Sequence, residues 1–134
     1  MSFSPRFKDV DSMGHVNNAN HLTYAEEARI DYLNKIFGLK MSWKKQGVIL
    51  AAVEINYHSP LLYPGNYQIQ TRTEKIGTKS FTLTFRIKEN RSRKLIALGK
   101  TVLVAYDYEK GRSIPVPASW SGKIRKFENS GARK

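Results

Sequence analysis

The hydrophobic pattern of this chain changes its period once, at Gly47, and this change limits the folds that the chain can adopt. From Asn20 to Phe37, apolar or aromatic residues recur at spacings of three and four with charged residues between them, which predicts one amphipathic helix ending at Gly38. After Gly47 the pattern becomes that of strands, either alternating or continuously apolar. These strand-like segments cover residues 48–59, 67–77, 79–89 and 94–107. The short, turn-like connections between them favour antiparallel neighbours.

One helix followed by four antiparallel strands defines an α+β fold. A single helix cannot cover both faces of such a sheet, so the sheet must curl around the helix, or a second copy of the protein must cover the apolar surface that remains. We therefore expect a homodimer at least. The chain shows no internal repeat and no low-complexity linker, which predicts one domain over residues 1–134 with a polar, basic C-terminal tail at 118–134.

The composition excludes several kinds of chemistry. The 134 residues include no cysteine, so disulfides, thiolate metal sites and cysteine nucleophiles are absent. The formal net charge of +12 favours anionic partners such as nucleic acids, membrane surfaces or phosphorylated small molecules. The longest hydrophobic run, at 48–53, is too short to span a bilayer, and the N-terminus has no apolar signal-like segment. We expect a soluble, cytoplasmic protein with no membrane partner.

A polar segment, DVDSMGHVNN at 9–18, precedes the predicted helix. Its residues can form a turn and a helix cap, because an asparagine can accept a hydrogen bond from an unpaired N–H of the first turn. The candidate caps are Asn17, Asn18 and Asn20. The histidines at 15, 21 and 58 are too scattered to make a metal cluster, so we expect no metal. The sequence also lacks a G-x-S-x-G serine motif, a P-loop and a dinucleotide-binding glycine motif.

The motif D-x-D-x-x-G-H-V-N-N precedes a helix with an aromatic residue and EEAR, and the segments INYHSPLLYPGNYQIQTRTEKIGTKSFTLTFRI and LIALGKTVLVAYDYEKGRSIPVP follow. This order resembles the 4-hydroxybenzoyl-CoA thioesterase-like family of hotdog-fold acyl-CoA thioesterases, over residues 5–117. The resemblance implies a long helix wrapped by a strongly curved antiparallel sheet. It also implies two protomers that join sheet edges, as a dimer or as a tetramer of paired dimers. One departure is His21, where many relatives carry tyrosine.

The resemblance further implies an active site between protomers at the N-terminal end of the helix, where an acyl-CoA thioester is hydrolysed to free acid and coenzyme A. Asp11 matches the catalytic carboxylate, as base or as nucleophile, and the backbone N–H of Asn18 matches the group that polarises the thioester carbonyl. Glu26 stands where relatives commonly keep an acidic residue, and its other interpretation is an exposed helix charge. The residues implied in substrate binding are His15, Asn17, Tyr57, Lys79 and Ser80, with Lys79 as the first candidate for a phosphate contact. Coenzyme A is part of the substrate, so no cofactor is expected.

Two other functions remain open on the sequence. One is hydrolysis of an acyl group from the pantetheine arm of an acyl-carrier protein, and the other is a non-catalytic basic module that binds nucleic acid on the same scaffold. Asp11 favours an enzyme, because a binding module needs no carboxylate at a helix N-terminus. Phe81 and Phe85 share one strand face with Leu83 and Ile87, as core residues do, which disfavours an exposed surface for nucleic acid.

Overall fold

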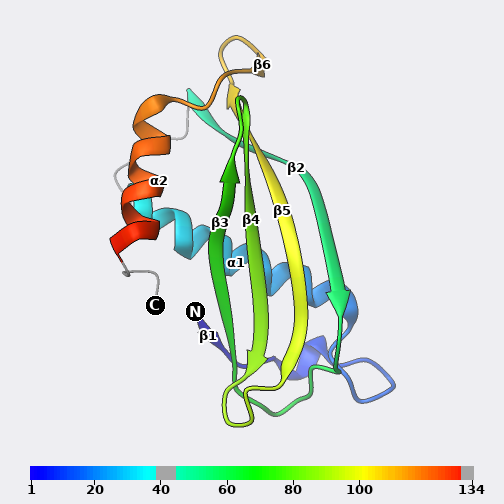
Figure 1. Cartoon of the computed structure of the whole chain (residues 1–134). Coiled ribbons are helices and arrows are strands. Elements are labelled where there is room, and N and C mark those ends of the chain that lie inside the picture. The colour runs from blue at the N-terminus through cyan, green and yellow to red at the C-terminus, as the bar shows by residue number, and fades with distance from the viewer. Residues whose placement is uncertain (39–44, 131–134) are drawn as a thin grey trace.

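The computed structural model describes residues 1–38 and 45–130, and its sheet is antiparallel throughout. The strand order is β1-β3-β4-β5-β2, with β6 paired to β5. The long helix α1 crosses one face of the curved sheet, and α2 lies on the β3 side (Figure 1). This arrangement confirms the predicted hotdog fold. The elements are β1 (Ser2–Phe3), the 3-10 helix η1 (Phe7–Asp9), α1 (Asn18–Phe37), β2 (Gln46–Tyr57), β3 (Tyr67–Ile76), β4 (Ser80–Glu89), β5 (Leu95–Asp107), β6 (Arg112–Ser113) and α2 (Ala118–Ser130).

Helix α1 begins and ends where its sequence supplies caps. The side-chain oxygen of Asn17 accepts the N–H of Ala19 at 2.9 Å. At the other end Gly38 has a φ of 81°, a conformation that favours glycine, and its N–H donates to the Asn34 carbonyl at 2.8 Å. The helix therefore ends where the sequence predicts and starts two residues earlier than the apolar spacing indicates, because Asn17 is the cap.

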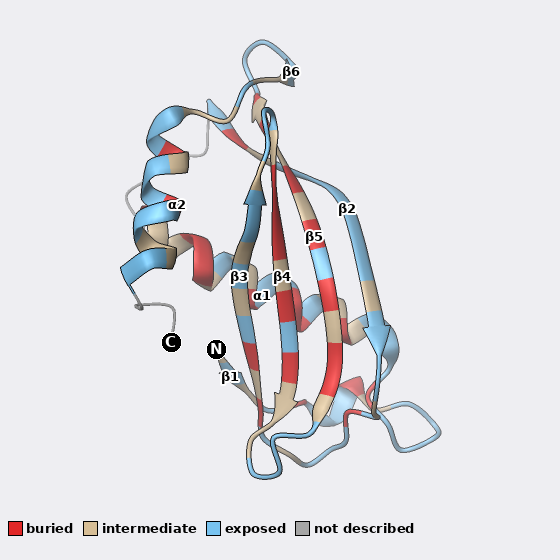
Figure 2. Cartoon of the chain, viewed as in Figure 1, coloured by how far each residue is buried: buried red, intermediate tan, exposed pale blue. Residues whose placement is uncertain are grey.

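The core lies between α1 and one face of β3, β4 and β5. On β4 the alternate residues Phe81, Leu83, Phe85 and Ile87 are buried, as the sequence pattern predicts. Gly99 on β5 makes room for one of them, because a Cβ built at Gly99 would lie 2.2 Å from the Phe85 ring. Buried and less buried residues alternate along β4 and β5 (Figure 2). The sheet therefore has one core face, and its other face is open to solvent.

Strand β2 differs from these neighbours because most of it is exposed (Figure 2). It ends the sheet, with β5 on one side and no other described strand beside it. Leu50 and Val53 pair with the buried residues Leu103 and Thr101 of β5, so their side chains point to the α1 face. They are nevertheless 47% and 39% exposed. This edge thus presents unpaired backbone groups and uncovered apolar side chains together.

Residues 118–130, within the segment predicted as a polar, basic tail, form the helix α2. Trp120 and Ile124 are four residues apart, which places them on one face of the helix, and both are buried. Glu128 accepts a hydrogen bond of 2.6 Å from Tyr32 Oη on α1. The helix is hard to recognise in the sequence because its few apolar residues stand among basic ones. Its packing on α1 and β3 stabilises it, and a short stretch of sequence does not show that packing.

Candidate active site

The loop that leads into α1 is held by its own hydrogen bonds. Asp11 Oδ1 accepts the N–H of Met13 at 2.9 Å, and the Asp11 N–H donates to the His15 carbonyl at 2.8 Å. Gly14, with a φ of 80°, allows the tight reversal between them. The Asp11 carboxylate is exposed, and no described residue donates a hydrogen bond to its second oxygen, Oδ2. One oxygen therefore fixes the loop and the other is available to react.

The start of α1 has one unoccupied backbone donor. The N–H of Asn17 donates to the Asp9 carbonyl at 2.9 Å. The N–H groups of Ala19 and Asn20 are both satisfied by Asn17, through its side chain and its carbonyl. Among the residues that the structure describes, nothing accepts the N–H of Asn18. A free N–H at the positive end of a helix dipole is suited to bind a negatively charged oxygen.

Asp9, two residues before Asp11, is buried. Tyr24 Oη donates a hydrogen bond to its carboxylate, and Arg6 Nε forms an ion pair with the same oxygen at 3.2 Å. The hydrogen bond from Tyr24 is the main cause of the lowered pKa of Asp9, and Arg6 adds to it. The two carboxylates of the motif thus have opposite surroundings: Asp9 anchors the loop to the core, and Asp11 faces solvent.

Tyr57, at the end of β2, contacts the first turn of α1. Its Oη donates to the Asn18 carbonyl at 3.0 Å, and its ring packs edge-on against His21 with ring centroids 5.0 Å apart. His21 is 1% exposed, and neither of its ring nitrogens has a hydrogen-bond partner among the described residues. Burial lowers the pKa of His21 from its usual value near 6.5. Sequence reasoning missed this pair, and also the contact of Asp9 with Tyr24, because no local pattern links residues so far apart in the chain.

The structure gathers most of the predicted site residues at the N-terminal end of α1. This group contains Asp11, His15, Asn17, Asn18 and Tyr57. Glu26 lies eight residues after Asn18, about 12 Å further along the helix at 1.5 Å per residue. There its carboxylate is 4.0 Å from Arg29 Nη2, and it is exposed. Glu26 therefore does not touch the start of the helix in its own chain.

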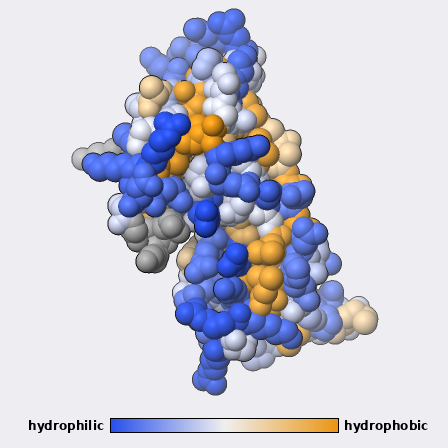
Figure 3. Space-filling model, viewed as in Figure 1, coloured by the Kyte–Doolittle hydropathy of each residue, from blue (hydrophilic) through white to orange (hydrophobic). Residues whose placement is uncertain are grey.

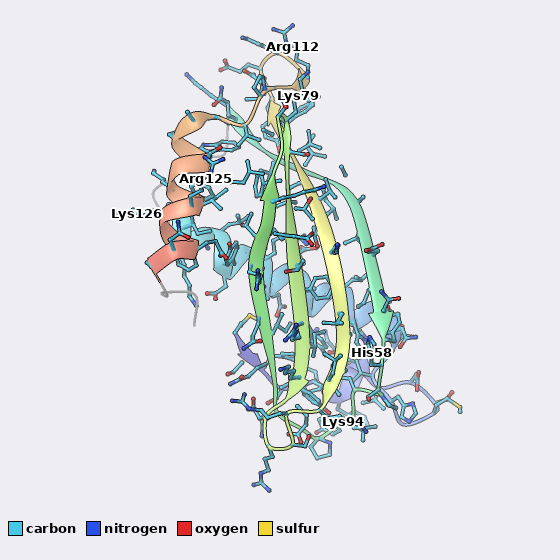
Figure 4. The ribbon with its side chains drawn as sticks, viewed as in Figure 1. His58, Lys79, Lys94, Arg112, Arg125 and Lys126 are labelled. Atoms are coloured by element: carbon cyan, nitrogen blue, oxygen red, sulfur yellow. The ribbon has the colours of Figure 1, made fainter. Side chains whose placement is uncertain are left out.

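Lys79 and Ser80 lie at the opposite end of the sheet. Ser80 pairs with Val104 of β5, whereas the motif end of the sheet contacts β5 at Ile96, whose carbonyl accepts the N–H of His58. The two positions on β5 are eight residues apart, or about 26 Å along a strand. Figure 4 shows Lys79 and His58 near opposite ends of the molecule. Within one chain, Lys79 and Asp11 therefore do not share a site.

A hollow of about 490 Å³ lies elsewhere, on the face of the sheet turned away from α1. Its lining includes Arg72, Arg86 and Lys100 together with Glu54 and Glu74. Lys100 Nζ is 3.2 Å from a carboxylate oxygen of Glu74, so part of this charge is neutralised within the hollow. Hydrophilic surface surrounds smaller hydrophobic areas in the view of Figure 3. Unlike the α1 end, the hollow has no carboxylate beside a helix N-terminus.

Within residues 1–38 and 45–130, no three His, Cys, Asp or Glu side chains are grouped so as to hold a metal ion. Over the same residues, no helix has both the length and the apolar character needed to cross a membrane. The α1 end presents the Asp11 carboxylate and the free backbone N–H of Asn18, and the aromatic side chain of Tyr57 lies next to them.

Comparison with known proteins assigns this architecture to a family. The family model of the thioesterase-like superfamily matches residues 5–124, and the chain belongs to this superfamily. A thioesterase of Thermus thermophilus, solved in complex with coenzyme A and zinc, is similar to this chain with 31% identity and a TM-score of 0.85, over 96% of this chain and 92% of that one. A predicted thioesterase of Bacillus stearothermophilus has 26% identity and a TM-score of 0.84, over 94% and 92% of the two chains.

Among curated proteins, the uncharacterized protein YsmA of Bacillus subtilis strain 168 is 30% identical over 119 residues, which is 88% of this chain and 76% of YsmA. These similarities confirm the predicted family and fold. They also support thioester hydrolysis as the general activity.

Proposed function

We propose that this protein hydrolyses acyl-CoA thioesters, with Asp11 and the backbone N–H of Asn18 as its reacting groups. The observation that carries the proposal is the free Asn18 N–H at the start of α1, beside a loop that exposes the Asp11 carboxylate. A thioester carbonyl placed at this N–H is stabilised as its oxygen becomes negative during attack. Membership of the thioesterase-like superfamily supports the same chemistry.

Two routes are compatible with one carboxylate. In the first, Asp11 takes a proton from water, the resulting hydroxide adds to the thioester carbon, and the C–S bond breaks as sulfur takes up the proton. In the second, Asp11 Oδ2 attacks the carbon and coenzyme A leaves as its thiolate. Water then hydrolyses the mixed anhydride to the acid and the free Asp11 carboxylate, and the proton of the acid passes to the thiolate. In both routes the Asn18 N–H stabilises the oxyanion, and Asn17 holds the first turn by capping it. His15 and Tyr57 flank this position as substrate contacts.

The proposed site uses two protomers. Antiparallel pairing of two β2 strands about a twofold axis satisfies the free edge and covers Leu50 and Val53. The same pairing lays the Gln46 end of one strand beside the Tyr57 end of the other. The Lys79 end of one protomer then lies near the α1 N-terminus of its partner, so residues from both ends of the sheet can serve one substrate. Light scattering coupled to size exclusion distinguishes this dimer from a monomer and from a tetramer.

Coenzyme A is the proposed carrier of the acyl group. The net charge of +12 suits its phosphates, and the similar thioesterase of Thermus thermophilus was solved with coenzyme A. Lys79 and Ser80, at the start of β4, are the proposed contacts for this carrier. Water and Asp11 supply the proposed reaction without a metal or an organic cofactor, so hydrolysis should persist in EDTA.

Asp11→Asn tests the proposal. The amide keeps the size of the side chain and an oxygen for the Met13 N–H but removes the charge, so kcat should fall by about 10²- to 10⁴-fold while KM changes little. Release of free thiol from a panel of aliphatic and aryl acyl-CoA substrates measures both constants. Asp31→Asn is the matched control, because Asp31 is exposed on α1 and pairs with Lys35. Undiminished hydrolysis by Asp11→Asn would exclude Asp11 as the base or nucleophile. A parent protein that is inactive on every substrate would exclude acyl-CoA hydrolysis as the function.

A further inference from the structure

The outer face of the sheet, turned away from α1, carries the hollow of about 490 Å³. In Figure 1 this face is turned toward the viewer, and α1 passes behind β3, β4 and β5. The lining comes from four strands that lie side by side, in the order β3, β4, β5 and β2. A hollow of this volume is large enough for a small molecule. The proposed hydrolysis uses none of its lining residues.

Two arginines and a threonine stand together in the hollow. Arg72 on β3 lies directly opposite Thr84 on β4, and Arg86 lies two residues further along β4. Residues two apart on a strand project from the same face, so Thr84 and Arg86 both point outward, whereas Phe85 between them is buried. Arg72 and Arg86 are therefore diagonal neighbours on adjacent strands, a spacing that long side chains can bridge. Both guanidinium groups and the Thr84 hydroxyl can thus reach one ligand.

The charges of the hollow are only partly balanced within the chain. Lys100 on β5 reaches across β4 to Glu74 on β3, with 3.2 Å between Nζ and a carboxylate oxygen. Arg72 and Arg86 are exposed and form no ion pair among the described residues, and the same holds for Glu54 on β2. Two unpaired guanidinium groups therefore stand near one unpaired carboxylate. Neighbouring like charges repel each other, and an anion between the two arginines removes this repulsion.

We propose that the hollow binds a phosphate monoester, with its phosphoryl group between Arg72 and Arg86 and with the Thr84 hydroxyl as a third donor. A phosphate monoester carries about two negative charges at pH 7, which match the two arginines. Its three terminal oxygens accept hydrogen bonds from several directions, and each guanidinium can donate two parallel bonds. The Glu54 carboxylate then accepts hydrogen bonds from hydroxyl groups on the rest of the ester. This site goes beyond the proposed thioesterase function and does not depend on it.

A second copy of the chain fits the hollow less well than a small anion does. Each copy brings two unpaired guanidinium groups and one unpaired carboxylate, so face-to-face packing leaves buried cations uncompensated. The net charge of +12 on each chain adds repulsion. A single-stranded nucleic acid stacks its bases on exposed aromatic rings, and the only aromatic residue of the lining, Phe85, is buried.

Calorimetric titration with three probes, at constant ionic strength, tests the proposal. The probes are glycerol 3-phosphate, inorganic phosphate, and glycerol, which has the hydroxyl groups without the phosphate. The parent protein should bind one glycerol 3-phosphate per chain, more tightly than inorganic phosphate, and should not bind glycerol. Arg72→Gln and Arg86→Gln should each raise the Kd for glycerol 3-phosphate by about tenfold or more, because each removes a charge-assisted hydrogen bond.

Glu54→Ala separates the two parts of the ligand. It removes a negative charge from the hollow, so inorganic phosphate should bind more tightly. The preference for glycerol 3-phosphate over inorganic phosphate should shrink by about threefold, because the ester loses an acceptor for its hydroxyl groups. Arg112→Gln is the matched control for the arginine variants, because Arg112 is exposed at the end of the sheet that carries β6 (Figure 4), and it should leave every Kd unchanged. Circular dichroism establishes that all variants are folded.

Absence of saturable binding by the parent would overturn the site. A Kd that Arg112→Gln raises as much as Arg86→Gln does would also overturn it, because phosphate would then be attracted by net charge alone. A raised KM for acyl-CoA in Arg86→Gln would assign the hollow to the thioesterase substrate and overturn the separate site. If no probe binds and Arg86→Gln changes the mass measured by light scattering, the hollow is an interface between copies. A protein without thioesterase activity leaves the test valid, because calorimetry needs no turnover.

Discussion

The two ends of the sheet use the same local structure for different purposes. At the α1 end, Asp11 Oδ1 accepts the N–H of the residue two positions later, Met13. The other end of the sheet, which carries β6, is called the basic end here after its exposed residues Lys45, Lys79, Lys110 and Arg112. There Asp107 Oδ1 accepts the N–H of Glu109 in the same way. Asp107 is buried and holds its turn, whereas Asp11 is exposed and has a second oxygen to which no described residue donates, in the loop that leads to the unpaired Asn18 N–H. A turn closed by an aspartate side chain is not by itself a catalytic site. Its surroundings decide whether the carboxylate can react.

The largest expected loss of activity follows from blocking the proposed β2–β2 dimer, because this separates the α1 end of one protomer from the basic end of its partner. Val53 is apolar and partly exposed on the α1 face of β2. Val53→Lys places an ammonium group from each protomer at the proposed interface, so we expect a monomer by light scattering. Each site then lacks the basic end of its partner, and kcat/KM should fall by about a hundredfold or more, as for a misplaced substrate.

Thr84→Lys is the control for Val53→Lys, because Thr84 pairs with Lys100 on the opposite face of the sheet, away from the proposed interface. It adds the same charge and should leave the dimer intact. Circular dichroism establishes that both variants are folded. A Val53→Lys protein that remains dimeric and fully active would place the interface elsewhere.

At the α1 end, Asp9 and Asp11 should contribute very different amounts to the free energy of unfolding. Asp9→Asn weakens buried contacts with Tyr24 and Arg6, so urea denaturation should show a loss of about 1–3 kcal/mol at pH 7. Asp11→Asn, at an exposed position, should cost no more than about 0.5 kcal/mol. The lowered pKa of Asp9 gives stability that is present above the unfolded pKa of 3.8 and is lost as the pH falls through the folded pKa. The gap between the parent and Asp9→Asn should therefore narrow below pH 3.8, and a constant gap would contradict this role.

At the basic end, Lys79→Ala should raise KM for acyl-CoA by about three- to tenfold with little change in kcat, because it removes a charge that binds the ground state and the transition state alike. Added salt should act in the same direction. Lys94→Ala is the control, because Lys94 is exposed near the other end of the sheet (Figure 4). If neither Lys79→Ala nor salt moves KM, Lys79 is an ordinary surface lysine.

The last prediction concerns the stability contribution of His21. Its pKa is lowered by burial, so the unfolded chain takes up a proton below pH 6.5 more readily than the folded one. Stability should therefore fall as the pH drops below 6.5, by up to about 1.4 kcal/mol per pH unit. His21→Phe should remove this component, whereas His58→Phe, at an exposed position, should retain it. Thermal denaturation at pH 7 and pH 5 measures the difference, and an unchanged pH response in His21→Phe would show that His21 is not its source.

Local patterns in the sequence were enough to predict the main elements of the protein. Spacings of three and four define α1, alternation defines β4, and Asn17 and Gly38 cap the helix through contacts within a few residues. These signals are local, so they can be recognised without the fold. The resemblance carried by the motif at 9–18 implies Asp11 and Asn18 as site residues, and they lie seven residues apart, on the loop before α1 and at the helix start.

Tertiary packing decided the rest. It determined which side chains are buried, which polar groups have no hydrogen-bond partner among the described residues, and how far apart the two ends of the sheet lie. Asp9 differs from Asp11 because it meets Tyr24, 15 residues away, and Tyr57 reaches Asn18 across 39 residues. The separation of about 26 Å between the α1 end and Lys79 follows from the length of β5 and its register with β4. Burial and long-range pairing depend on how whole elements pack, and a short stretch of sequence does not record them.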